Sequence, residues 1–119
     1  MLPLNFTEPK GYNRIGALLM FAGVALGAFG AHALDLSGRY KDIYQTASFY
    51  LIVHGLALLI YSLKAIPSLA GPLIFVGTLI FSGSLYLLVL TQTGWLGAIT
   101  PMGGTLLLMG WLVWALKAR

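Results

Sequence analysis

The chain has 119 residues, enough for one domain, yet 59% of them are hydrophobic and only 8% are charged. A soluble domain of this size cannot bury so much apolar surface. The mean hydropathy of +0.89 therefore predicts a membrane protein and excludes a disordered chain. The net charge of +4 comes from scattered Lys and Arg residues, so no nucleic acid is expected as a partner. The absence of cysteine excludes disulfides and thiolate metal sites.

Long uncharged stretches predict four membrane-spanning helices. Ile15–Leu34 carries no formal charge, and as a helix it would cover roughly 30 Å, the thickness of the hydrocarbon core. The uncharged stretch from 65 to 116 would measure about 78 Å as one helix, so it must fold back, and the polar residues at 91–94 mark the turn. The sequence thus predicts a four-helix antiparallel bundle as one membrane domain over 15–116, with a short N-terminal arm (1–14) and a basic tail (117–119). Its expected helices are about 15–34, 43–63, 69–90 and 95–116.

The distribution of Lys and Arg predicts the orientation of this bundle. Loops rich in these residues stay in the cytoplasm. Four spans place five of the seven basic residues on the side that holds both termini, namely Lys10, Arg14, Lys64, Lys117 and Arg119. The opposite side holds only Arg39 and Lys41, which Asp35 and Asp42 balance. Both termini are therefore expected to be cytoplasmic.

Small residues recur along the predicted helices and indicate where the helices pack. In lipid no hydrophobic force drives helices together, so close backbone approach at small residues supplies the contacts instead. The expected packing positions are Gly16, Gly23, Gly27, Gly30, Gly55, Gly77, Gly83 and Gly110. Pro101 lies inside the fourth predicted span, close to Gly103 and Gly104, and is expected to kink this helix or to end a shorter initial turn. A broken helix that lines a solute site is the functional alternative.

His54 is the most prominent polar residue at predicted membrane depth. Thr46, Tyr50 and His54 follow one another at intervals of four residues, so they share a helix face that could carry protons or a solute. The structural alternative is a neutral imidazole that bonds to Tyr50 or to a hydroxyl of the third helix, Thr78 or Ser82, and fixes helix register. We favour this structural role over conduction. Ser82 and Tyr86 are further polar candidates.

His32 and Asp35 lie three residues apart near the outer end of the first predicted helix. With two histidines and no cysteine in the chain, a complete set of metal ligands is hard to assemble, so neither a metal nor a cofactor is expected. The chain contains no Ser/His/Asp set, no carboxylate pair at membrane depth and no phosphate-binding loop. An enzyme is therefore not the favoured class.

Four local motifs resemble one known family. They are the octapeptide Gly27-Ala-Phe-Gly-Ala-His-Ala-Leu34, Tyr50-x-x-x-His54, Phe81-Ser-Gly-Ser-Leu-Tyr86 and Ile99-Thr-Pro-Met-Gly-Gly104 with Gly110-Trp111. In this order, over residues 15–116, they resemble the YgdD-like family of small bacterial inner-membrane proteins. The resemblance implies a multi-pass plasma-membrane protein and supplies no reaction, because the function of that family is unknown. His32, His54, Pro101, Gly103 and Gly104 fall on positions of the family pattern.

The sequence offers many packing surfaces and little chemistry. The favoured hypothesis is therefore a non-enzymatic bundle that binds another membrane protein or a lipid. A second copy of the chain is a further candidate partner beside the bilayer itself. The alternative is a small-solute or proton-conducting component that uses Thr46, Tyr50, His54 and the helix break at Pro101.

Overall fold

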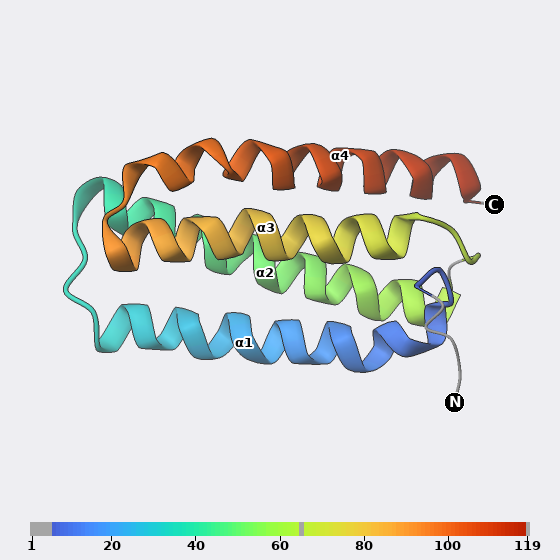
Figure 1. The fold of residues 1–119 in the computed structure, drawn as a ribbon. Coiled ribbons are helices and arrows are strands. Elements are labelled where there is room, and N and C mark those ends of the chain that lie inside the picture. Colours follow the sequence, from blue (N-terminus) through green and yellow to red (C-terminus); the bar gives the residue numbers. More distant parts are fainter. Residues whose placement is uncertain (1–5, 65, 119) are drawn as a thin grey trace, which may run out of the picture.

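Four long helices form an antiparallel bundle in the computed structural model, which describes residues 6–64 and 66–118 (Figure 1). The helices are α1 (Tyr12–His32), α2 (Gly38–Lys64), α3 (Ala70–Thr91) and α4 (Thr100–Lys117), and the short 3-10 helices η1 (Pro9–Gly11) and η2 (Gly94–Ala98) precede α1 and α4. Residues 6–64 and 66–118 contain no strand. All four long helices are long and apolar enough to cross a membrane. The prediction of an all-α membrane fold with four spans is therefore confirmed.

Helical structure satisfies the hydrogen-bonding groups of a backbone that crosses lipid. Because the bilayer core offers no water, every backbone N–H and C=O there needs an internal partner, which a helix supplies. The chain has a positive φ at two of its reversals, at Gln92 directly after α3 with φ of 54° and at Gly38 at the start of α2 with φ of 56°. Since α2 begins at Gly38, the expected outer loop that contains Asp35 and Asp42 is mostly helical, and only residues 33–37 connect α1 to α2.

The helices pack in sequence order, and a pair of glycines brings together each of the two hairpins, α1–α2 and α3–α4. A Cβ atom added to Gly16 would lie 2.6 Å from the carbonyl oxygen of Gly55, and one added to Gly77 would lie 3.0 Å from that of Gly103. These distances leave no room for a side chain, so the backbones touch. Close contact at small residues is the means by which helices associate in lipid.

Most of the other predicted packing glycines also lie at helix contacts. A Cβ on Gly23 or Gly110 would collide with Ile52 or Ile74, and one on Gly30 would collide with the ring of Tyr44. A Cβ on Gly27 would make only an ordinary contact, 3.9 Å from the side chain of Ser48. Gly83 is the exception, because a Cβ there meets no atom within 4 Å. Gly83 is therefore not at a helix contact, contrary to the prediction, because the space beside it on α3 is open.

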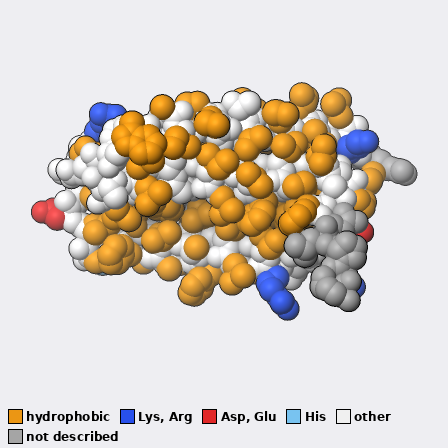
Figure 2. All heavy atoms as spheres, in the orientation of Figure 1, with side chains coloured by type: hydrophobic (Ala, Val, Ile, Leu, Met, Phe, Trp, Pro, Cys, Tyr) orange, Lys and Arg blue, Asp and Glu red, His pale blue; other side chains and the backbone are white. Residues whose placement is uncertain are grey.

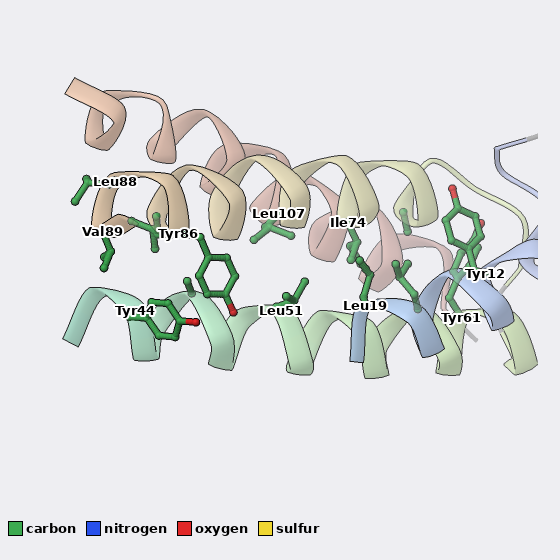
Figure 3. Packing of buried hydrophobic residues seen from close by; sticks show 14 residues of the cluster. Tyr12, Leu19, Tyr44, Leu51, Tyr61, Ile74, Tyr86, Leu88, Val89 and Leu107 are labelled. Carbon is green, nitrogen blue, oxygen red and sulfur yellow. The ribbon is translucent and has the colours of Figure 1, made fainter. Parts of the chain in front are cut away.

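The contact between α2 and α3 depends on hydroxyl groups and not on a close pair of glycines. The hydroxyls of Ser48 and Tyr86 lie 2.7 Å apart, and Ser82 donates to the backbone oxygen of Ala47 at 2.8 Å. The rings of Tyr44 and Tyr86 meet edge to face beside them, and Figure 3 shows Tyr86 reaching from α3 toward α2. Two of the polar residues singled out from the sequence, Ser82 and Tyr86, thus hold the two hairpins together.

Two buried tyrosines fasten the N-terminal arm to the bundle. Tyr12 donates to the carbonyl of Phe6 at 2.6 Å, and Tyr61 donates to that of Thr7 at 2.5 Å and accepts from the N–H of Ser68. The rings of Tyr12 and Tyr61 pack edge to face at 5.3 Å. Residues 1–5 of the predicted arm and Arg119 of the predicted tail lie outside the described residues.

The surface of the bundle is that of a protein surrounded by lipid. Large apolar side chains are exposed along its length, among them Phe21 at 72% and Leu108 at 73%. Figure 2 shows these side chains over most of one face, with charged side chains toward the two ends. The described beginning of α1 and the end of α4 lie at the same end of the bundle (Figure 1).

Candidate functional site

A cavity of about 650 Å³ that is open to the surface of the bundle lies between α2 and α4, over the ring of Phe81 from α3. We call it the α2–α4 cavity. Its size is typical of sites that bind small molecules. It is almost entirely apolar. Helix α2 contributes Phe49, Tyr50, Val53 and His54, and helix α4 contributes Pro101, Gly104, Thr105, Leu107, Leu108 and Trp111.

His54 forms the polar part of the wall and links α2 to α4. Its side chain is only 5% exposed. Nδ1 lies 2.8 Å from the backbone oxygen of Tyr50, one turn earlier in α2, and the indole N–H of Trp111 donates to Nε2 at 3.0 Å.

These two bonds define the protonation state of the ring. An indole N–H can only donate, so Nε2 must carry a lone pair, and a carbonyl oxygen can only accept, so Nδ1 must carry the proton. His54 is therefore a neutral imidazole in its Nδ1–H tautomer, with both nitrogens in use. A second proton on Nε2 would set two donors against each other and break the bond to Trp111.

The structure corrects the expected partners of His54. The hydroxyl of Thr78 bonds to the carbonyl of Ile74 in its own helix, and that of Ser82 bonds to Ala47. Neither reaches the imidazole. The bond to Tyr50 goes to its backbone oxygen and not to its hydroxyl, so helix register is fixed against α4 and not against α3.

The ring and the hydroxyl of Tyr50 have different surroundings. The ring lies 4.5 Å from that of Phe81 and is nearly parallel to the imidazole of His54, 5.7 Å away. The hydroxyl has no hydrogen-bond partner among residues 6–64 and 66–118, and it is not fully buried. It is thus a donor that a bound molecule can use.

The residues of the predicted polar stripe separate in the structure. Tyr50 and His54 line the α2–α4 cavity together with Pro101, whereas Thr46 is exposed on α2 and is not part of the lining. Gly104 lines the cavity, while Gly103 faces α3, where a Cβ would collide with the backbone of Phe81. The stripe therefore does not form one continuous wall.

Pro101 lies in the first turn of α4, so it does not interrupt a helix. The missing N–H costs little there, because the first turn of a helix has no acceptors for its N–H groups. The separate 3-10 helix η2 precedes it, which agrees with the expected shorter initial turn and not with a kink in mid-helix.

His32 is exposed at the end of α1 and makes no hydrogen bond or ion pair with any residue in the described ranges. His32 is not part of the cavity lining, and no other residue of α1 contributes to it. Within the described part of the chain, no group of three or more His, Cys, Asp or Glu residues could hold a metal ion.

Comparison with known proteins shows the family to which the chain belongs. Residues 26–104 match the family described as "Protein of unknown function (DUF423)". The chain belongs to the DUF423 family. It is 49% identical over 106 residues to a UPF0382 membrane protein of Staphylococcus epidermidis, covering 83% of this chain and 87% of that one. It is 40% identical over 108 residues to the UPF0382 membrane protein YwdK of Bacillus subtilis, covering 83% and 88%.

Membership in DUF423 confirms the coarser part of the expected resemblance, a family of small bacterial multi-pass membrane proteins of unknown function. The protein is therefore a bacterial integral membrane protein. No solved structure matches the chain.

Trp111 is the residue of this DUF423 protein that the sequence interpretation missed. Trp111 and Trp114 lie near the end of the last predicted span, so the sequence favours a place for both in the belt of aromatic residues at the membrane surface. In the structure Trp111 instead donates to His54 at the wall of the cavity, and Trp114 stacks on it at 5.3 Å. The signal in the sequence was that an indole N–H and an imidazole both lie within predicted spans, where each needs a hydrogen-bond partner.

Proposed function

We propose that this protein is a non-enzymatic lipid-binding membrane protein that holds an apolar chain in the α2–α4 cavity. The single observation that supports this proposal is a cavity of about 650 Å³ with an almost wholly apolar wall in a chain whose four helices can span a membrane. Apolar side chains such as Val53 and Leu108 favour an apolar occupant.

The dimensions of the cavity support a chain-like ligand. The lining residues of α4 run from Pro101 to Trp111, which at 1.5 Å per residue is roughly 15 Å, about half the thickness of the hydrocarbon core. A chain that lies along this length remains at the depth of the acyl chains of the bilayer. No charged residue lines the cavity, so the proposed ligand is uncharged where it contacts this wall.

The polar groups of the cavity support binding more than transport. Both ring nitrogens of His54 already have partners within the protein, and Thr105 donates to the backbone oxygen of Pro101 at 2.8 Å. A proton pathway needs a continuous series of exchangeable groups, and Thr46 stands apart from this one.

We further propose that both termini are cytoplasmic, because the end of the bundle that holds them carries the larger share of Lys and Arg. The four motifs that span residues 15–116 support a finer family assignment to the YgdD-like proteins.

The proposal is tested by filling the cavity. Gly104 lines it, and a Cβ there makes only ordinary contacts with the ring of Phe81, at 3.7 Å and 3.8 Å. Gly104→Leu therefore places a side chain in the cavity without displacing backbone. Gly83→Leu is the matched control, because Gly83 is a helical glycine with open space around it and lies outside the lining.

The measurement is native mass spectrometry of protein purified from membranes and washed with delipidating detergent. We expect the wild-type chain and Gly83→Leu to retain one lipid molecule, and Gly104→Leu and Leu108→Trp to lose it. Equal retention by all four proteins, or none by the wild type, would contradict the proposal.

A further inference from the structure

We infer that the ligand of the α2–α4 cavity is an isoprenoid quinone, a flat ring with carbonyl acceptors on an apolar tail. This inference rests on the proposed function, since it names the class of lipid that the cavity binds. Two features of the wall carry it: a series of aromatic rings, and one hydroxyl donor with no partner in the described part of the chain.

The rings follow one another across the cavity from α2 to α4. Centroid distances are 6.0 Å from Phe49 to Tyr50, 4.5 Å from Tyr50 to Phe81, 5.7 Å from Tyr50 to His54 and 5.8 Å from His54 to Trp111. Aromatic faces and edges attract other flat rings beyond the contribution of the area they bury. A saturated acyl chain gains only the burial of its apolar area on this wall, whereas a quinone ring gains the interaction between aromatic rings as well.

The free hydroxyl donor of Tyr50 favours those flat molecules that carry a hydrogen-bond acceptor. The Tyr50 hydroxyl is not fully buried, and every other polar side chain of the cavity already has a partner, as described for His54, Trp111 and Thr105. A hydroxyl held in an apolar environment without an acceptor is costly, so a ligand that brings a neutral acceptor is favoured. A quinone carbonyl is such an acceptor, and it carries no charge that would need a counter-ion in this wall.

Small residues on α4 leave space for the ring. Gly104 has no side chain, and its neighbour Thr105 turns its hydroxyl back to the carbonyl of Pro101. The wall of α4 is therefore low beside Gly104, but a Cβ there would already contact the ring of Phe81 at 3.7 Å, so the ring of a ligand lies along the cavity and not between Gly104 and Phe81. On this lining the ring lies beside Tyr50, and the tail follows the apolar part of the wall at Val53 and Leu108.

The test compares three probes in nanodiscs of saturated phosphatidylcholine that contain the intact protein. The probes are a naphthoquinone with a short isoprenoid tail, squalene as a tail without a ring, and the naphthoquinone ring without a tail. The amount of each probe retained in excess of that held by nanodiscs without protein gives its affinity for the protein. The variants are Tyr50→Phe, which removes the donor alone, and Tyr40→Phe, a matched control whose ring lies outside the cavity lining.

We expect the tailed quinone to bind more tightly than squalene or the bare ring. Tyr50→Phe should weaken quinone binding roughly two- to tenfold, the effect of one hydrogen bond, and leave squalene binding unchanged. Tyr40→Phe should change neither. Thermal unfolding of both variants measures whether the fold is intact.

The failures of the two proposals are distinguishable. If quinone and squalene bind equally and Tyr50→Phe has no effect, the quinone inference is wrong and the lipid-binding proposal stands. If no probe binds and the wild-type chain also retains no lipid in the cavity-filling experiment, both are wrong.

Discussion

Removal of the indole donor of Trp111 should destabilise the bundle by about 1–2 kcal/mol. The substitution Trp111→Phe keeps an aromatic ring at the same place and deletes the N–H that bonds to His54 at 3.0 Å. His54 is only 5% exposed, so no water replaces the lost donor, and Nε2 remains a buried acceptor without a partner. Such a group costs about 1–3 kcal/mol, and hydrogen bonds between membrane helices contribute about 0.6 to 1.7 kcal/mol in double-mutant cycles.

The matched control is Trp114→Phe. Trp114 stacks on Trp111 at 5.3 Å, but its indole N–H has no hydrogen-bond partner in the residues the structure describes. Both substitutions remove the same atoms, so the difference between their effects isolates the hydrogen bond. The free energy of unfolding is measured by reversible denaturation in mixed micelles, for each single variant and combined with His54→Ala in a double-mutant cycle.

Nitrogen NMR tests the tautomer directly. In a His32→Gln background His54 is the only histidine. We expect a protonated Nδ1 and an unprotonated Nε2 in the wild type, and a change at Nε2 in Trp111→Phe. Equal destabilisation by Trp111→Phe and Trp114→Phe, a coupling energy near zero, or a protonated Nε2 in the wild type would refute the assigned network.

Three other predictions concern the architecture. Single cysteines at Ser37 and Gln92 should react with an impermeant thiol reagent added outside intact cells, while one at the exposed Ile66 should not; labelling at Ile66 alone would reverse the proposed orientation. Gly16→Leu and Gly77→Leu should each cost at least about 1–3 kcal/mol of unfolding free energy in the micelle assay, because the new side chain meets backbone, whereas Gly83→Leu should cost less than about 0.5 kcal/mol. Tyr86→Phe should cost about 1 kcal/mol by leaving the Ser48 hydroxyl without its partner, and no further loss should follow when Ser48→Ala is added.

The sequence predicts the number of spans and most of the helix contacts for a clear physical reason. Charges cannot lie in the hydrocarbon core, so they limit the helices, and small residues are the positions at which two backbones can approach. Gly16, Gly55, Gly77 and Gly103 follow this rule. Gly83 does not, because a glycine in a lipid-facing position looks the same in the sequence as one in a contact.

The partner of His54 could not be predicted in the same way. In a soluble protein, alternation of polar and apolar residues shows which side of a helix faces the core. In these helices the outward side is as apolar as the inward one, so hydropathy does not fix their rotation, and the glycine contacts alone do not show which side chains of another helix reach His54. Trp111, 57 residues away, and the α3 hydroxyls were therefore equivalent candidates, and only the packing of α4 distinguishes them.

The division of contacts between glycines and hydroxyls has a consequence for biogenesis. Both members of each glycine pair lie within one hairpin, so a hairpin can reach its closest packing as soon as its two helices have entered the bilayer. The hydroxyl contacts of Ser48 and Ser82 form only when both hairpins are present. We therefore expect insertion in two halves followed by lateral association, and a chain cut between α2 and α3 should reassemble when its two halves are co-expressed.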